Sequence, residues 1–445
     1  MKTKAIQFWD WLRTSFWFVP TLATILAIGL SFMMTHLDGR IGDDWPQTWW
    51  IYGGQPEGGR ILLSTIAGSM ITVAGVVFSI TIVVLSLASS QFGPRLLRNF
   101  MRDPGNQIVL GTFVGTFIYC LLVLRTVTGD GEEGFVPHLS ITFGIVLAIF
   151  SLGVLIYFIH HISASIQAST IISTVGEELD EAIDGVFPEE LGEETPESRQ
   201  RGKADIPKEF EAEAVSICAS EIGYLQAIDN EKLMRLARQK NLLLRLVQRP
   251  GDYISWGHVL VRAWPRERVD ETVSGQIHAA FILGRERTLT QDVKFGIQQL
   301  VETAVRAVSP GINDPFTATT CIDRLGASLS RLAERTIPSP YRYDDENHLR
   351  IIADPVTFVE VAEDAFEDIR QYGSSSIAVT LRLLESLAVI GTHIHREEDR
   401  AALLRHAEQV KTEAKEKLTM SWYRSEIDAR YAAVLRALTR QREAA

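Results

Sequence analysis

Four long stretches of the chain are apolar throughout, with no Asp, Glu, Lys or Arg in their interiors. Each approaches or exceeds the roughly 20 residues that a helix needs to cross the hydrocarbon of a bilayer. The pattern therefore predicts four transmembrane helices, at Ser15–Met34, Ile61–Ser90, Ile108–Leu124 and Leu139–Ile159. The first is expected to remain as an anchor, because its apolar part is too long for a secretory signal and no small-residue cleavage site follows it.

After residue 161 the apolar positions recur with the spacing of amphipathic helices and short strands. The expected fold class is a four-helix membrane domain followed by an α+β region that is mostly helical. The segment His348–Asp354 is expected to form a strand or hairpin. The predicted boundaries are 1–161 for the membrane domain, 162–188 for a helical stalk, 189–210 for an acidic linker, 211–266 for a small β-containing module and 267–445 for a helical domain.

The order of strands in the β-containing module resembles a barrel-sandwich hybrid, the fold of biotinyl and lipoyl carriers. The Lys that such carriers modify has no counterpart in 211–266, so a carrier function is not implied.

The predicted stalk continues the fourth span as a helix with one apolar seam. Its positions step by four and three residues, as in a short coiled coil. They are Ala168, Ile172, Val175, Leu179, Ala182 and Val186. The seam is consistent with self-association or with packing on the chain's own domain, and the sequence does not decide between them. Under self-association, Leu179→Asp should lower the mass of the oligomer in detergent.

Charge separates the two parts of this 445-residue chain, which is 46% hydrophobic overall. Through His161 nine basic residues balance nine acidic ones, so the remainder carries the whole net charge of −11. An acidic domain argues against nucleic acid as a partner, because phosphate binding needs clustered Lys and Arg. The three cysteines are too few and too scattered for a disulfide framework.

The distribution of Lys and Arg in the short loops predicts the orientation. Six lie before the first span or between the second and third, whereas three lie on the opposite side among acidic residues. Both termini are therefore expected in the cytoplasm of a bacterium, with the chain in its inner membrane.

The second span carries a stripe of small residues, most of them hydroxyl-bearing. The stripe residues are Thr65, Ser69, Thr72, Gly75, Ser79, Ser86 and Ser90. Small residues let membrane helices approach closely, so the first interpretation is a helix-packing seam. The alternative is a water-lined path surrounded by several copies of this span. Gln91, Arg95 and Arg98 would then form its cytoplasmic mouth, where a charged ring can select ions.

The segment AVSPGINDPFTA joins two predicted helices. Ser309 and Gly311 lie where the first helix ends, while Asp314 is placed to cap the second. A functional alternative makes Asn313, Asp314 and Thr317 ligands for a cation or a polar effector.

Signatures of enzymes and metal sites are absent from the sequence, so no catalytic residue, cofactor or metal ligand is expected. The adjacent His160 and His161 point about 100° apart on a helix and would not chelate one ion together.

Several of these segments, above all SMITVAGVVFSITIVVLSLASSQFGPRLL and AVSPGINDPFTA, resemble a bacterial family of membrane proteins described only as a domain of unknown function. The resemblance implies a four-span inner-membrane protein and no particular activity. From the residues, the leading hypothesis is a homo-oligomer in membrane lipid that forms a channel-like conduit regulated by its cytoplasmic region. The alternative is a non-conducting, membrane-anchored scaffold or sensor that binds a cytoplasmic partner or a small ligand.

Overall fold

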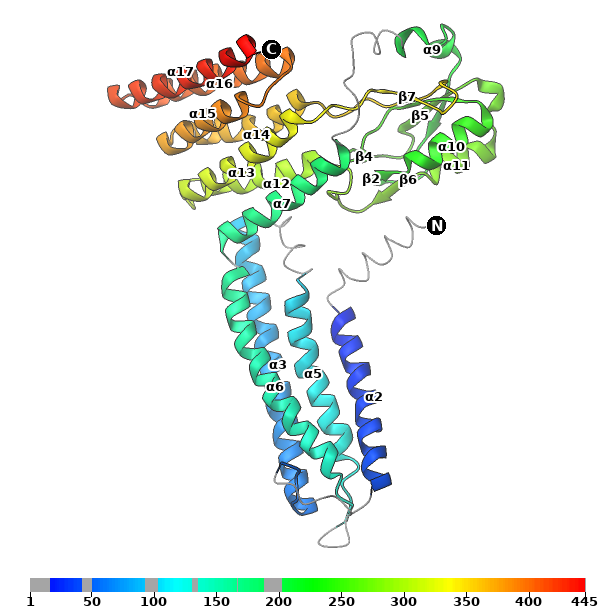
Figure 1. Ribbon diagram of the computed structural model, residues 1–445, viewed down its shortest axis with the longest axis vertical. Helices are drawn as coiled ribbons and strands as arrows, with labels where there is room; N and C mark the ends of the chain where they lie inside the picture. The colour runs from blue at the N-terminus through cyan, green and yellow to red at the C-terminus, as the bar shows by residue number, and fades with distance from the viewer. Residues whose placement is uncertain are drawn as a thin grey trace. The chain divides into compact units, whose positions relative to one another are not determined.

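The computed structural model describes residues 17–41, 50–92, 103–129, 135–165, 167–187 and 202–444. The chain divides into two compact units, Met1–Ile171 and Ile172–Ala445 (Figure 1). The first unit is a bundle of helices. The second combines two small β-sheets with a larger group of helices.

Four helices in the described part of the first unit are long and apolar enough to cross a membrane. They are α2 (Phe18–Ile41), α3 (Pro56–Phe92), α5 (Pro104–Leu124) and α6 (His138–Ser165). The four predicted spans are therefore confirmed. With 37 residues, α3 extends over roughly 55 Å at 1.5 Å per residue, well beyond the roughly 30 Å of hydrocarbon.

The helix α5 forms the centre of the membrane unit and packs against α2, α3 and α6. Tyr119, Cys120 and Val123 are fully buried there. The start of α5 is capped by a carboxylate. Asp103 accepts a hydrogen bond from the backbone N–H of Gly105 at the start of α5. This contact satisfies an N–H group that a helix leaves unpaired at its first turn.

A second carboxylate, Asp38 near the end of α2, is buried against the start of α6. It accepts from the backbone N–H groups of Leu139 and Ser140, each at 2.9 Å, and from the Ser140 hydroxyl at 2.6 Å. This carboxylate therefore ties α2 to the first turn of α6.

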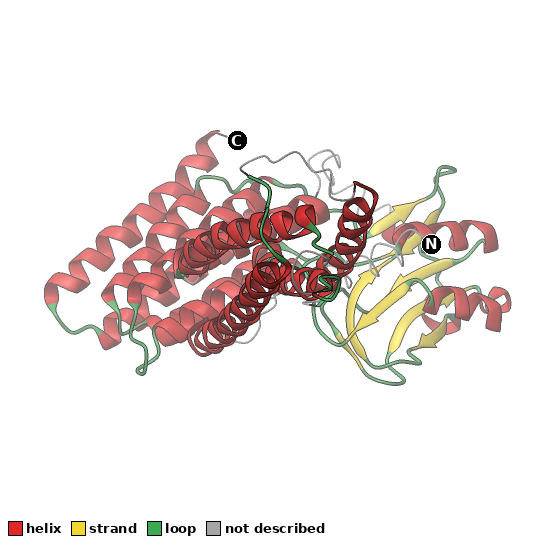
Figure 2. Ribbon diagram, turned by 90° about the horizontal axis from the view of Figure 1, so that it is seen from below, coloured by secondary structure: helices red, strands yellow, loops and turns green. Residues whose placement is uncertain are grey.

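Two sheets lie at one end of the second unit, and most of its helices lie at the other (Figure 2). The five-stranded sheet has the order β1-β5-β3-β8-β7, and the three-stranded sheet has the order β4-β2-β6. The strands are β1 (Val215–Cys218), β2 (Gly223–Ile228), β3 (Leu243–Leu246), β4 (Tyr253–Ile254), β5 (Val259–Trp264), β6 (Phe281–Gly284), β7 (Tyr341–Tyr343) and β8 (Leu349–Ile352). Among the described strands, β3 and β8 are the pair that runs parallel, with Leu244 opposite Ile351.

Short helices cover the sheets, and longer ones build the rest of the unit. The helical elements are α7 (Ala168–Val186), α9 (Phe210–Glu213), α10 (Asn230–Lys240), η3 (Arg266–Arg268), α11 (Glu271–His278), α12 (Val293–Ala307), α13 (Pro315–Glu334), α14 (Phe358–Gly373), α15 (Ile377–Gly391), α16 (Glu397–Lys417) and α17 (Ser421–Ala444). A buried core joins both sheets to α10 and α11, with Leu225, Leu236 and Ile277 among its members. A smaller cluster around Phe210 covers the opposite face of the five-stranded sheet.

The sheets extend beyond the predicted module 211–266. β6, β7 and β8 come from the segment expected to be helical, and β7 and β8 form the hairpin expected around His348–Asp354. These strands join because β8 adds to β3 in parallel across more than 100 residues of sequence, a pairing without a local sequence signal. The predicted stalk is likewise two helices rather than one, since α6 ends at Ser165 and α7 begins at Ala168.

Candidate functional site

The stripe of small residues on α3 faces outward from the bundle. All seven predicted positions are exposed. The face of α3 that packs against the bundle is the opposite one, since successive residues turn by about 100°. Its buried residues are Leu63, Ala67, Ala74, Val77, Thr81, Val84 and Ala88. The stripe is therefore not a packing seam within the described part of the chain.

The outward face of α3 carries these small residues together with exposed apolar side chains, among them Val76 and Val83. A methyl group added at Gly68 or at Gly75 would meet nothing within 4 Å. The hydroxyls of Thr65, Thr72 and Ser79 donate to carbonyls four residues earlier, at 2.7, 2.8 and 2.9 Å. Because these hydroxyls keep acceptor capacity, the face can pack closely on another helix or accept from water.

The residues predicted to form a cytoplasmic mouth are not placed. Arg95 and Arg98 lie outside the described residues, and of Gln91 only its position in α3 is described.

The predicted seam of α7 is buried inside the second unit. Ile172, Val175, Leu179 and Ala182 are buried, whereas Ala168 and Val186 are half-buried. Leu179 contacts α12, where a methyl group added at Gly296 would lie 3.0 Å from its Cδ1. In this structure the seam therefore packs on the chain's own domain, which is one of the two alternatives that the sequence left open.

Polar contacts reinforce the position of α7 on α13. The hydroxyl of Ser328 donates to Asp180 at 2.6 Å, and Asp184 pairs with Arg331 at 2.5 Å and with Arg335 at 2.6 Å. The hydrogen bond from Arg331 holds the pKa of Asp184 below its usual value. Ion pairs and a hydrogen bond therefore hold the polar side of α7 against α13, while its apolar side is held by burial.

The AVSPGINDPFTA segment forms the turn between α12 and α13. Asp314 caps α13: its Oδ1 accepts from the backbone N–H groups of Phe316 and Thr317 at 3.1 Å, and its Oδ2 accepts from the Thr317 hydroxyl at 2.5 Å. These bonds, the Thr317 hydroxyl foremost, lower the pKa of the Asp314 carboxyl. Asn313 takes a left-handed conformation with φ of 51°. Both Asp314 oxygens are thus engaged by the helix start.

The cap gives a direct prediction. Asp314→Ala should lower the free energy of unfolding by about 0.5 to 2 kcal/mol, the usual cost of losing an N-cap side chain. Asn313→Gly is the matched control, because glycine adopts the same left-handed conformation without strain. Urea denaturation of both variants measures the difference. An Asp314→Ala variant as stable as the control would contradict the capping role of this carboxylate.

Of the two adjacent histidines singled out in the sequence, His161 has local partners. The Nε2 of His161 pairs with Asp103, and its ring stacks on Tyr157 with centroids 5.2 Å apart. His393 pairs with Glu334 at 2.6 Å. Among the described residues, no group of three or more His, Cys, Asp or Glu side chains is arranged to hold a metal ion.

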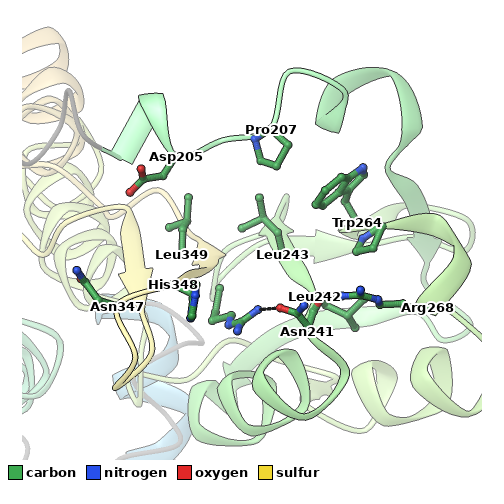
Figure 3. Close-up of a pocket in the computed structure, with 12 residues that line it drawn as sticks. Asp205, Pro207, Asn241, Leu242, Leu243, Trp264, Arg268, Asn347, His348 and Leu349 are labelled. Atoms are coloured by element: carbon green, nitrogen blue, oxygen red, sulfur yellow. Dashed lines mark hydrogen bonds between the residues drawn. The ribbon is translucent and has the colours of Figure 1, made fainter.

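A cavity of about 450 Å³ lies at one end of the three central strands of the five-stranded sheet (Figure 3). Here β3 and β8 begin and β5 ends, because β5 runs antiparallel to the parallel pair of β3 and β8. The segment before α9 supplies a further wall. The lining residues are Asp205, Pro207, Asn241, Leu242, Leu243, Trp264, Pro265, Arg268, Asn347, His348, Leu349 and Arg350.

One side of the cavity is apolar and another is polar. Leu243, Leu349 and Trp264 also belong to the small cluster around Phe210. Arg350, which is 7% exposed, donates from Nε to Asp344 at 2.7 Å and from Nη1 to the side chain of Asn241. Asn241, in turn, accepts from Arg268 at its backbone oxygen at 2.8 Å. None of these residues was predicted as a site from the sequence.

The apolar helices and the attached α+β unit together define a multi-pass membrane protein. The chain belongs to the family described as "Predicted membrane protein (DUF2254)", which matches residues 13–389.

Relatives from mycobacteria align with most of this chain. The chain is 33% identical over 387 residues to "Uncharacterized protein Rv1290c" of Mycobacterium tuberculosis and to "Uncharacterized protein Mb1321c" of Mycobacterium bovis. Each alignment covers 86% of this chain and 72% of the relative. No solved structure matches the chain.

Proposed function

We propose that several copies of this chain assemble in the membrane around α3 and form a channel-like conduit. The observation that carries the proposal is that all seven stripe residues are exposed, on the side of α3 opposite its own bundle. Glycine and serine on a lipid-facing surface would leave a helix without close contacts, whereas such residues are enriched where membrane helices meet.

The stripe suits a conduit as well as a contact. It is free of charge and carries hydroxyls between apolar side chains such as Val83, and α3 is longer than the bilayer is thick. Copies of α3 that converge on one axis would give a narrow, weakly polar path whose wall could pass small ions or water.

The proposal also includes the membrane and the orientation of the chain in it. The excess of Lys and Arg in the loops at one side favours both termini in the cytoplasm of a bacterial inner membrane. The second unit would then be a cytoplasmic regulatory domain, and the role proposed for the protein is not enzymatic.

Single-channel recording of the purified protein in planar bilayers tests the conduit. Ser79→Leu and Ser86→Leu should each reduce the unitary conductance several-fold or abolish it, because a larger apolar side chain narrows and dries the path. Phe78→Trp is the matched control. It enlarges an exposed residue about 100° away from Ser79 on the same helix and about 180° away from Ser69, and its conductance should stay near that of the wild type.

The same recordings address the alternative. A wild-type oligomer that passes no current, or serine variants that conduct like the control, would contradict the conduit. The protein would then be better described as a membrane-anchored scaffold or sensor. The cavity beside Arg350 is the observation that favours the sensor.

A further inference from the structure

The polar side of the cavity is built from hydrogen-bond donors. Asn241 is the centre of the arrangement, because its side-chain oxygen accepts from Arg350 and its backbone oxygen accepts from Arg268. Both oxygens are thus engaged, and the Nδ2 amide group of Asn241 remains as a donor. Asn241 ends α10 in a left-handed conformation, with φ of 48°, and lies just before the first residue of β3.

Each guanidinium also keeps unused N–H groups. Arg350 is held through Nε and Nη1, and Arg268 through Nη1. The hydrogen bonds of these two side chains to described residues use Nε and Nη1, so the Nη2 groups of both are left without an acceptor in this part of the chain. Three donor groups from Asn241, Arg268 and Arg350 therefore line one cavity without an acceptor from this part of the chain.

The charge of the lining favours an anion. Arg350 forms an ion pair with Asp344, a carboxylate that does not line the cavity. Arg268 has no acidic partner among the described residues, and it therefore adds an unbalanced positive charge to the lining. The single acidic residue of the lining is Asp205, which lies at the other side and accepts from the hydroxyl of Tyr343 at 2.9 Å. Guanidinium groups bind phosphate in preference to neutral acceptors, with two N–H groups on one oxyanion.

The remaining wall accommodates an apolar body. In Figure 3 the side chains of Leu243, Leu349 and Trp264 lie above those of Asn241 and Arg268. The volume of about 450 Å³ falls within the range of pockets that hold small molecules.

We propose that this cavity binds a small organic phosphate, with its phosphate group held by Arg268, Arg350 and Asn241 and its flat apolar body against Trp264. Three donor groups from three residues match the three terminal oxygens of a phosphate ester better than the two oxygens of a carboxylate. The inference is independent of conduction by the membrane unit.

Isothermal titration calorimetry of the full-length protein in detergent, with phenyl phosphate as the probe, tests the proposal. The wild type should bind it saturably, and more tightly than inorganic phosphate, phenol or benzoate, each of which lacks part of the recognised chemistry. Arg268→Ala should weaken the binding of phenyl phosphate at least tenfold, the loss expected from charge-assisted hydrogen bonds. Arg268 is exposed, so the variant should fold.

Arg266→Ala is the matched control, because Arg266 lies in the same short helix η3, is exposed and does not line the cavity. It should bind phenyl phosphate within twofold of the wild type. Equal affinities in the two variants, or no saturable binding by the wild type, would overturn the site. Phenol or inorganic phosphate binding as tightly as phenyl phosphate would overturn the two-part recognition, and tighter binding of benzoate would overturn the choice of phosphate.

Discussion

Asp344→Ala should lower the free energy of unfolding of the second unit by about 3 to 5 kcal/mol, the usual cost of leaving one partner of a buried ion pair alone. The side chain of Asp344 is 1% exposed and that of Arg350 is 9% exposed, with 2.7 Å between the carboxylate and Nε. The carboxylate also accepts from the backbone N–H groups of Glu346 and His348, at 3.0 and 2.9 Å. The variant would therefore lose the ion pair and the hydrogen bonds that stabilise the β7–β8 hairpin.

Asp345→Ala is the matched control for this prediction. Asp345 is the next residue and also pairs with an arginine, Arg238, but its side chain is 86% exposed. An exposed ion pair contributes about 0 to 1 kcal/mol, so this variant should remain close to the wild type. Urea denaturation followed by far-ultraviolet circular dichroism measures both. Similar losses in the two variants would contradict the role assigned to the buried pair.

The same carboxylate gives a pH dependence with a defined sign. Burial alone would raise the pKa of Asp344, but the backbone hydrogen bond from His348 and the ion pair with Arg350 lower it to about 2. Because the pKa in the folded state lies below the usual 3.8, the carboxylate stabilises the fold fully above about pH 4. That stabilisation is lost as the pH falls through 2. The difference between the wild type and Asp344→Ala should therefore shrink between pH 4 and pH 2, and a constant difference would contradict it.

The four spans could be predicted from the sequence because uninterrupted apolar runs of this length have few other uses. Which face of each helix packs inward could not. In a bilayer both the lipid and the protein interior are apolar, so a membrane helix needs no polar side to mark its exposed face. The stripe on α3 was visible in the sequence, but its outward direction is set by Ala67, Ala74 and Val77, which are no more apolar than their exposed neighbours.

The cavity illustrates a different limit. Its residues come from four segments, near Pro207, Asn241, Trp264 and Arg350, and they meet because β8 pairs in parallel with β3. Hydrophobic periodicity identifies a strand around Arg350 but not its partner strand. Arg350 is the one charged residue in the otherwise apolar strand β8, and this was the local signal of a buried cation. It gives no information on the ligand.

Gly176 shows how a residue that is unfavourable in a helix can make room for a side chain of a neighbouring helix. Glycine lowers the helix propensity of α7. In the structure the side chain of Arg324 lies directly over it, and a methyl group at this position would come within 2.8 Å of Nε. Arg324 donates from that place to the hydroxyl of Ser173 at 2.9 Å. The glycine therefore leaves room for the Arg324 side chain, which reaches from α13 to α7.

Leu179→Ala should lower the free energy of unfolding of the second unit by about 2 to 5 kcal/mol, the cost of a cavity in a packed core. Leu179 is fully buried, and its Cδ1 would lie 3.0 Å from a methyl group added at Gly296 of α12. Urea denaturation measures the loss. Glu181→Ala is the matched control, since Glu181 is exposed on the same helix and surface substitutions usually change stability by less than about 0.5 kcal/mol.

The variant also separates the two explanations of the α7 seam. Since Ile172, Val175 and Leu179 are buried against their own chain, the seam has no apolar face left for a neighbour, and the native mass of the folded Leu179→Ala protein in detergent should equal that of the wild type. Assembly would then depend on other surfaces, of which the outward face of α3 is the one proposed here. A smaller native mass with little change in stability would instead show that copies of α7 meet in the oligomer, and that the intramolecular contacts of Leu179 do not hold in the assembled protein.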